Sequence, residues 1–319
     1  MRKDLTEAYG MSMECSTTSS SALPAIRLPD RYNYIAAFLT LGCNLRCAYC
    51  INRFGTQGRH ELMSGRQWLG GLNRLVSRPD LPVTLQGGEP TLHPDFYEIV
   101  NGLRADLAID LLTNLQFDVR EFMANVHPGR MRRQAPYASI RVSYHPATMD
   151  WHRTKADVLT LLSGGYSVGI WAVRHPGQIE QIEAAHSDAA AAGIDFRFKE
   201  FLGVHEGVLY GQYKYAGAVG GTGETGATQS CVVGVSDCTV DCRTSELIVG
   251  PSGGVYRCHG DLYEARPPIG HINDAAFDID ELFRTCDVFG RCNPCDVKVK
   301  TDRFQAFGHT SVEIRRRKR

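Results

Sequence analysis

The sequence predicts an α/β fold: a partial, TIM-like barrel of six βα units, followed by a small cysteine-rich domain. From residue 34 onward, short apolar runs rich in β-branched residues alternate with helical patterns, as in a parallel sheet with crossover helices. Six such units over roughly 170 residues are too few for a closed eight-stranded barrel, so the barrel should be open. Seven of the eleven cysteines lie after residue 230, which places a cysteine-rich unit toward the C-terminal end.

The elements follow in a regular order. Residues 1–30 show no persistent helical or alternating pattern, so we expect a loose N-terminal arm there. The six strands are expected at residues 34–40, 83–87, 109–114, 139–145, 168–175 and 196–202. The helices between them are expected at residues 64–78, 95–106, 119–126, 154–165 and 176–193.

A change of composition after residue 205 separates the barrel from the C-terminal part. We expect the barrel over residues 31–208, and a glycine- and threonine-rich segment plus the cysteine-rich domain over residues 209–319. That segment is either a plain linker or a lid over the active site. The terminal RRRKR is expected to be a solvated run of charge.

The overall composition excludes some classes of partner. Lysine plus arginine and aspartate plus glutamate both number 35, which argues against attraction of the whole protein to nucleic acid or an anionic membrane. A small polar molecule or a peptide is the better match. The chain has no apolar run of about 18 residues and no apolar secretory signal, so we expect a cytoplasmic protein without a membrane span.

Three closely spaced cysteines, Cys43, Cys47 and Cys50, follow the first expected strand. Thiolates at C-x3-C-x2-C spacing converge from one loop onto a soft metal centre, and three of them leave an iron–sulfur cluster one ligand short. The alternative is a zinc site completed by a fourth ligand such as His60. In parallel α/β barrels the loops after the strands carry the active site, so position and ligand type agree.

The second strand ends in QGGEPTLHP, about 40 residues after the cysteines. Adjacent glycines let a charged ligand approach backbone amides, and a carboxylate accepts hydrogen bonds from an ammonium group. Together with Tyr49 before the last cysteine of the C-x3-C-x2-C motif, this segment resembles the radical S-adenosylmethionine (radical SAM) superfamily. The resemblance implies that Gly87, Gly88 and Glu89 bind the amino group of S-adenosylmethionine, and that Tyr49 belongs to the same cofactor site.

Further polar residues stand at the ends of later strands. Asn114, Ser143 and Arg174 are placed where they would meet a nucleoside, and the resemblance implies ribose and carboxylate contacts from positions such as the first two. Helix capping is an equally open role for such residues. Tyr144, His145 and His175 are expected to line the substrate site.

The resemblance also implies the chemistry. The fourth iron of the cluster would bind S-adenosylmethionine, and electron transfer would release a 5′-deoxyadenosyl radical that removes hydrogen from an unreactive C–H bond. An external electron donor such as flavodoxin or ferredoxin would be needed.

The C-terminal cysteines form a second motif. Between Cys242 and Cys258, a strand, a turn at Gly253 and a returning strand would form a hairpin that brings these two cysteines together. The later CNPC segment adds Cys292 and Cys295. This arrangement resembles the twitch domain, a short form of the SPASM extension with a β-hairpin, a helix and an auxiliary cluster. Two 4Fe–4S clusters are therefore expected, with a four-cysteine zinc ribbon as the alternative. The remaining cysteines Cys231, Cys238 and Cys286 have no assigned role, and any of them is a candidate to replace one of the four ligands.

The reaction and its substrate stay open between several hypotheses. The first is epimerisation of a carbohydrate or aminocyclitol, as in antibiotic biosynthesis, with Cys231 or Cys238 returning a hydrogen atom. The second is dehydrogenation of an alcohol, with the auxiliary cluster as electron acceptor and Lys199 or Glu200 as base. A ribosomally made peptide is the alternative substrate, and a zinc-stabilised adaptor that binds nucleic acid through the basic tail is the non-enzymatic alternative.

Overall fold

A computed structural model describes residues 23–50, 61–201, 203–210, 239–287 and 312–316. Most of the expected N-terminal arm and of the linker or lid segment lies outside these ranges. The same holds for five residues named above: His60, Cys231, Cys238, Cys292 and Cys295.

Six parallel strands form the centre of the molecule, as the sequence predicts. They pair in chain order from β2 to β8, with every neighbouring pair parallel. The strands are β2 (Tyr34–Thr40), β4 (Val83–Gly87), β5 (Ile109–Thr113), β6 (Ile140–Tyr144), β7 (Val168–Arg174) and β8 (Phe196–Glu200). Among the described strands, β8 pairs with β7 alone and ends the sheet, so the barrel is open, as expected.

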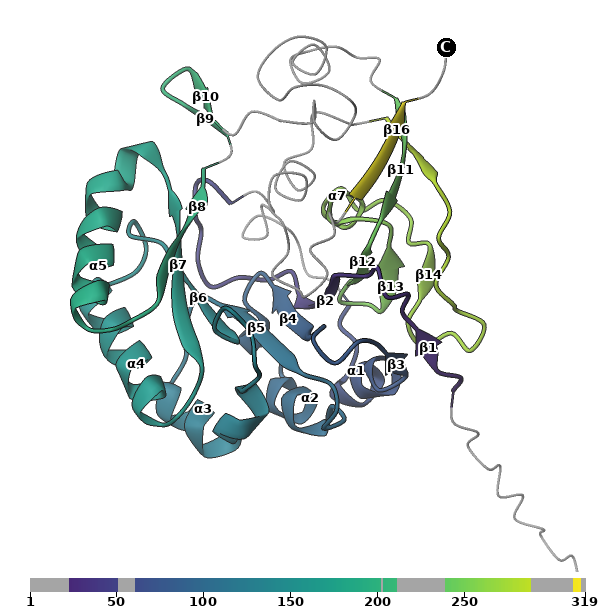
Figure 1. Ribbon diagram of the computed structural model, residues 1–319, viewed down its shortest axis with the longest axis horizontal. Helices are drawn as coiled ribbons and strands as arrows, with labels where there is room; N and C mark the ends of the chain where they lie inside the picture. The colour runs from purple at the N-terminus through teal and green to yellow at the C-terminus, as the bar shows by residue number, and fades with distance from the viewer. Residues whose placement is uncertain (1–22, 51–60, 202, 211–238, 288–311, 317–319) are drawn as a thin grey trace, which may run out of the picture.

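Five helices connect these strands and cover the outer face of the curved sheet (Figure 1). They are α1 (Gly65–Leu72), α2 (Phe96–Gly102), α3 (Val119–Asn125), α4 (Trp151–Ser163) and α5 (Ile179–Ala191). Short 3-10 turns at Pro90–Leu92, Pro128–Met131 and Pro176–Gln178 each begin with a proline, whose fixed backbone angle suits the first position of a helical turn.

Two expectations about the N-terminal half are wrong at their edges. The expected helix at 64–78 ends at Leu72, because β3 (Leu75–Val76) pairs in parallel with β1 (Ile26–Arg27). The loose arm therefore does not extend to residue 30, since the Ile26 side chain is fully buried and its amide donates to the Arg74 carbonyl.

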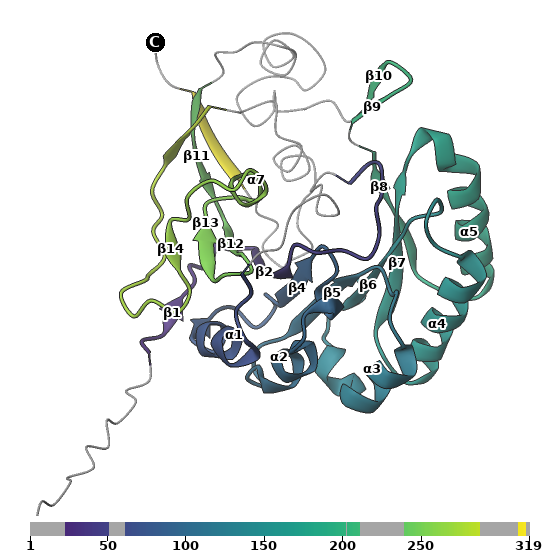
Figure 2. The same ribbon diagram turned by 180° about the vertical axis from the view of Figure 1, so that it is seen from behind.

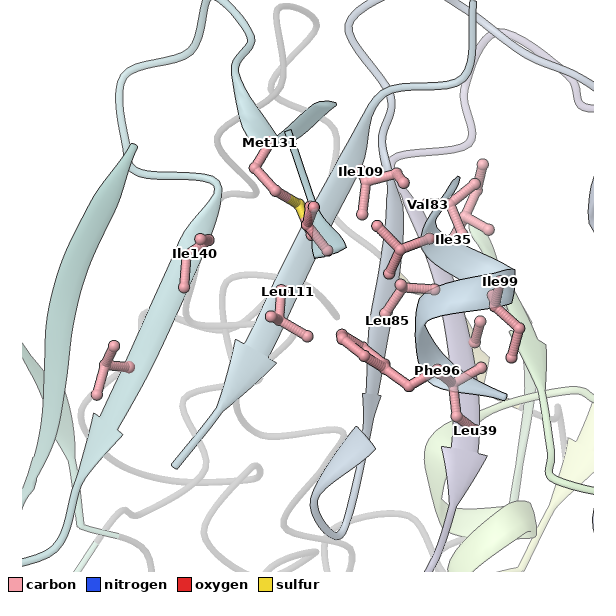
Figure 3. Close-up of a cluster of buried hydrophobic side chains, with 14 of the residues drawn as sticks. Ile35, Leu39, Val83, Leu85, Phe96, Ile99, Ile109, Leu111, Met131 and Ile140 are labelled. Atoms are coloured by element: carbon pink, nitrogen blue, oxygen red, sulfur yellow. The ribbon is translucent and has the colours of Figure 1, made fainter. Parts of the chain in front are cut away.

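The main hydrophobic core lies between the sheet and the helices. Alternate strand residues such as Ile35, Val83 and Ile109 point toward α2 residues Phe96 and Ile99, as Figure 3 shows. This alternation, with a period of two, assigns every strand residue either to the helix side or to the inner side of the barrel.

The C-terminal part continues the barrel sheet rather than standing apart from it. The strand β12 (Glu246–Val249) pairs in parallel with β2, and β13 (Gly254–Tyr256) and β14 (Gly270–His271) extend the sheet to nine strands. The helix α7 (His259–Tyr263) follows β13, so the expected hairpin and helix are both present. Figure 2 shows α7 on the inner side of the sheet, opposite α1–α5.

Three further strands make a small separate sheet: β11 (Val240–Thr244), β15 (Arg284–Cys286) and β16 (Val312–Arg316), with β11 in the middle. A two-stranded hairpin of β9 (Gly203–His205) and β10 (Val208–Tyr210) follows the barrel. No helix in the described ranges is long and apolar enough to cross a lipid bilayer.

Candidate active site

The cysteine loop follows the carboxyl end of β2. The side chains of Cys43, Cys47 and Cys50 are neither fully buried nor fully exposed, and a turn joins the Cys50 amide to the Cys47 carbonyl at 3.1 Å. Burial, and then the neighbouring thiols, raise the pKa of Cys47 to about 11. The thiols are thus close enough to act on one another, and a positively charged metal centre would favour their thiolates.

The Gly-Gly-Glu segment packs directly on this loop. The Gly88 amide donates to the Thr40 carbonyl at 3.0 Å, and the Glu89 amide donates to the Gly42 carbonyl at 2.9 Å. A Cβ atom on Gly88 would lie 2.1 Å from the Gly42 oxygen, a separation that no side chain tolerates. The expectation that these glycines expose amides to a ligand is therefore wrong for Gly88, since its amide and that of Glu89 are already bound to the cysteine loop.

Glu89 is a buried centre of hydrogen bonds. Its Oε1 accepts from Thr113 Oγ1 at 2.8 Å and from Thr91 Oγ1 at 2.7 Å, and its Oε2 accepts from the Asn114 amide at 2.7 Å. The carboxylate has no exposed surface and ties the end of β4 to the end of β5. Burial raises the pKa of Glu89, and these hydrogen bonds oppose that rise. A contact to an ammonium group stays a prediction.

Asn114 joins the end of β5 to the cysteine loop. Its side-chain amide donates to Asn44 Oδ1 at 2.6 Å and lies 3.8 Å from Cys43 Sγ. The structure thus brings Cys43, Glu89 and Asn114 together, as the expected cofactor site requires. Ser143 lies on the inner side of β6, on the strand face opposite the helices.

Tyr49 forms a second group with histidines from the ends of β6 and β7. Its hydroxyl oxygen lies 2.9 Å from His145 Nδ1, and its ring centroid lies 5.0 Å from that of His175. Burial, with a smaller contribution from Lys199, lowers the pKa of His145 to about 4, so this imidazole is neutral at pH 7. The structure brings His145 and His175 beside Tyr49, and their contact with a substrate stays a prediction.

His205 was not anticipated. Its ring lies 4.8 Å from that of His175, and it stands at the end of β9. The two residues between the hairpin strands, Glu206 and Gly207, both have positive φ angles of 49° and 79°. The Glu-Gly pair between short apolar runs was the available signal for this turn.

Two expected site residues face away from the cysteine loop. The Arg174 guanidinium donates to Glu183 Oε1 on α5 at 2.7 Å. The Tyr144 ring packs on Trp151 of α4, with ring centroids 5.2 Å apart. Both positions share strand parity with core residues on the helix side, so the expectation that Arg174 lines the site is wrong. Tyr144 is still near enough to help raise the pKa of Tyr49, after burial and Cys47, so its place beside the site stays a prediction. The same alternation puts Lys199 on the inner side of β8 and Glu200 on the other side.

The C-terminal cysteines in the described ranges come from three different elements. Cys242 lies on β11, Cys258 directly precedes α7, and Cys286 ends β15. A side-chain hydrogen bond with Cys286, then burial, raises the pKa of Cys242, and Cys258 is close enough to add to the rise. Cys242, Cys258 and Cys286 are thus near enough to act on one another, and their role as ligands of one cluster stays a prediction.

Donor chemistry decides which group these cysteines fit. Both sets consist of thiols, the ligands that iron–sulfur clusters prefer. Within the described ranges, no group of three or more His, Cys, Asp or Glu side chains is close enough to hold a single metal ion. A cavity of about 30 Å³ between β11 and the β12–β13 hairpin has room for about two waters and is too small for a substrate.

Comparisons with known proteins agree with this geometry. Residues 38–196 match the family model described as the radical SAM superfamily. The mycofactocin maturase MftC of Mycobacterium ulcerans is 23% identical over 314 residues, which cover 81% of this chain and 78% of that relative. The PqqA peptide cyclase of Methylorubrum extorquens is 40% identical over 87 residues, which cover 27% of this chain and 22% of that relative.

Solved structures show the same fold. The protein anSMEcpe with bound AdoMet has a TM-score of 0.54 and 14% identity, and the match covers 92% of this chain and 93% of that chain. Its complex with AdoMet and the Kp18Cys peptide has a TM-score of 0.53 and 14% identity. The predicted fold class, a partial α/β barrel with a mostly parallel sheet, is confirmed.

Proposed function

Since the chain belongs to the radical SAM superfamily through residues 38–196, we propose that it modifies a ribosomally made peptide by radical chemistry. Membership implies S-adenosylmethionine and one 4Fe–4S cluster, as expected from the sequence. Cys43, Cys47 and Cys50 would hold that cluster. When bound, cluster and S-adenosylmethionine supply a 5′-deoxyadenosyl radical that removes a hydrogen atom from the substrate.

The observation that carries this proposal is the joining of three loops at one edge of the sheet. Backbone hydrogen bonds connect the cysteine loop to the Gly88–Glu89 segment, and Glu89 and Asn114 connect both to the end of β5. These contacts fix the distances between the cysteines and the positions where a nucleoside would lie. Such rigidity would generate the radical at one defined point, where it meets the substrate before it reacts with solvent.

The residues of this chain have definable tasks around that point. Tyr49 is held by the neutral His145 and presents its ring beside the last cysteine of the loop. His175 and His205 continue this aromatic wall toward the β9–β10 hairpin. We propose that a substrate lies along this wall, between the cysteine loop and the ends of β6–β8.

The peptide assignment is supported by the relatives. One is named a PqqA peptide cyclase, and the fold neighbour anSMEcpe has been solved with a peptide bound. The carbohydrate or aminocyclitol epimerase expected first has no support from these comparisons and stays a prediction, as does its hydrogen donor Cys231 or Cys238. The comparisons favour the alternative substrate over the first choice.

We further propose that the C-terminal cysteines hold an auxiliary cluster. Cys242, Cys258 and Cys286 approach one another in the described ranges, while Cys292 and Cys295 lie outside them. Cys286 is therefore a candidate ligand beside the four expected ones. The mixed origin of these cysteines, from a strand, a helix start and a second strand, supports a site that assembles only in the folded chain.

The experiment is peptide modification by the anaerobically reconstituted enzyme. Short peptides encoded beside the gene are incubated with enzyme, S-adenosylmethionine and reductant, and a mass change is sought by mass spectrometry. A mass change in one peptide that disappears with Cys43→Ala, and persists with the outward-facing Arg174→Gln, is the expected result. Turnover of nucleotide sugars or aminocyclitols with no change in any peptide would contradict the proposal.

A further inference from the structure

Arg257 occupies an unusual position beside the C-terminal cysteines. It directly precedes Cys258, between the end of β13 and the start of α7. Its side chain is only 10% exposed. A guanidinium keeps its charge at any physiological pH, so this residue places a permanent cation in the protein interior.

Two hydrogen bonds fix the direction of this cation. Arg257 Nη2 donates to Asp261 Oδ1 at 2.8 Å, one turn along α7, and Nη1 donates to the Thr285 carbonyl at 2.5 Å. Thr285 is the residue before Cys286. The guanidinium therefore connects the chain segments that carry Cys258 and Cys286, two of the three approaching cysteines.

In the part of the chain that the structure describes, one nitrogen of this side chain has no partner. Within the described ranges, the buried Arg257 Nε has no hydrogen-bond partner. A buried N–H group of a charged side chain that lacks an acceptor is costly, so an acceptor is expected beside it when the site is complete. Sulfur atoms of a thiolate-bound cluster are such acceptors.

The electrostatics agree with this placement. Burial acts to lower the pKa of Arg257, but the Asp261 hydrogen bond, Cys258 and Cys242 together raise it. The cation and these cysteines are thus within interaction range of one another.

We propose that Arg257 is a positioning residue of the auxiliary cluster, whose fixed charge stabilises the thiolate ligands and raises the reduction potential of the cluster they hold. This inference rests on the auxiliary cluster proposed above. A positive charge in a low-dielectric surrounding favours the reduced, more negative form of a cluster, because it attracts the added electron. An auxiliary cluster tuned in this way accepts an electron from a substrate radical more readily.

Arg266 provides a matched control. Its guanidinium also faces Asp261, at 3.8 Å, and pairs with Asp287 at 3.1 Å, but its side chain is 34% exposed. The hydrogen bond with Asp287 raises the pKa of Arg266 against burial, with smaller effects from Asp261 and Arg257. Removing Arg266 takes away the same charge from the same carboxylate without taking it from the cysteines.

The test isolates the auxiliary cluster in the full-length chain. Cys43, Cys47 and Cys50 are replaced by alanine together, so that any remaining cluster is the C-terminal one, and Arg257→Gln, Arg257→Lys and Arg266→Gln are made in this background. Iron content is measured after anaerobic reconstitution, folding by circular dichroism, and the midpoint potential by redox titration followed by electron paramagnetic resonance.

The expected result is a full iron content with a more negative midpoint potential in Arg257→Gln, a smaller shift in Arg257→Lys and none in Arg266→Gln. Iron lost from Arg257→Gln but kept by Arg257→Lys also supports the proposal, because the charge is then needed for ligand assembly. An unchanged potential in Arg257→Gln, or equal loss of iron from both Arg257 variants, overturns it. No iron in the parent background overturns the auxiliary cluster itself, and this inference with it.

Discussion

Gly88→Ala tests the packing between the two loops that define the site. The new Cβ would lie 2.1 Å from the Gly42 oxygen and 2.5 Å from its carbonyl carbon, whereas real Cβ contacts stay above 3.0 Å. The cysteine loop would therefore have to move away by roughly 1 Å, because the backbone on both sides leaves no other space.

Two consequences of that movement can be estimated. The hydrogen bonds from the Gly88 and Glu89 amides would be lost or stretched, at about 1 kcal/mol each, so the free energy of unfolding should fall by about 2 kcal/mol. A displacement of about 1 Å near the reacting atoms costs on the order of 100-fold in rate, so cleavage of S-adenosylmethionine should fall by about that factor.

The assays are urea unfolding and the rate of 5′-deoxyadenosine formation. Gly70→Ala in α1 is the control, because its Cβ would lie 3.6 Å from its nearest neighbour, Asn273 Oδ1, and alanine favours the helix by about 0.5–1 kcal/mol. If Gly88→Ala has the same free energy of unfolding and the same rate of 5′-deoxyadenosine formation as the parent, the two loops are not packed as described.

Three other perturbations give separate checks. The free energy of unfolding should fall by about 2 kcal/mol between pH 6.5 and pH 4. The reason is that the folded-state pKa of His145 lies below its ordinary value, so the unfolded chain takes up the proton first. Urea unfolding across this range should show a smaller fall in His145→Gln and the parent's fall in the exposed control His152→Gln. Arg174→Gln should change the rate of 5′-deoxyadenosine formation by less than about twofold and the free energy of unfolding by less than about 1 kcal/mol, since its ion pair with Glu183 is exposed. A large loss of activity would mean that Arg174 does contact the cofactor. Cys286→Ala should lower the iron content from about eight to about four per chain, whereas an unchanged content would leave Cys286 a spare thiol.

The barrel was predictable because its information is local. Each of the six strands is a short apolar run bounded by polar or glycine residues, and all six begin within one residue of the expected position. The apolar pair Leu75–Val76 was misassigned to a helix because its partner, Ile26–Arg27, lies 49 residues earlier in the sequence. Pairing over such a distance leaves no periodic signal.

The sequence was enough to predict which motifs form the candidate site, but not on which face of a strand each side chain lies. The cysteine loop, Glu89 and Asn114 lie together because parallel strands end at one edge of the sheet. Arg174 was misplaced because a shift of one residue along a strand reverses the face of the sheet, and strand ends are uncertain by that amount. Cys286 was left unassigned because only the β11–β15 pairing brings it to Cys242.

The role of Gly88 shows a further limit of sequence reasoning. Two adjacent glycines indicate a close approach of something to the backbone, and the sequence suggested a ligand. The structure shows that the approaching group is the carbonyl of Gly42. Whether a ligand or a neighbouring loop approaches these glycines depends on how the loops after β2 and β4 lie in the folded sheet.

Iron content and S-adenosylmethionine cleavage in the same anaerobic preparation test the central claim most directly. The parent chain should bind iron and form 5′-deoxyadenosine when reduced, and Cys43→Ala should abolish the 5′-deoxyadenosine while keeping the auxiliary iron. A chain that binds no iron after anaerobic reconstitution, or that leaves S-adenosylmethionine intact with its clusters full and reduced, would contradict it.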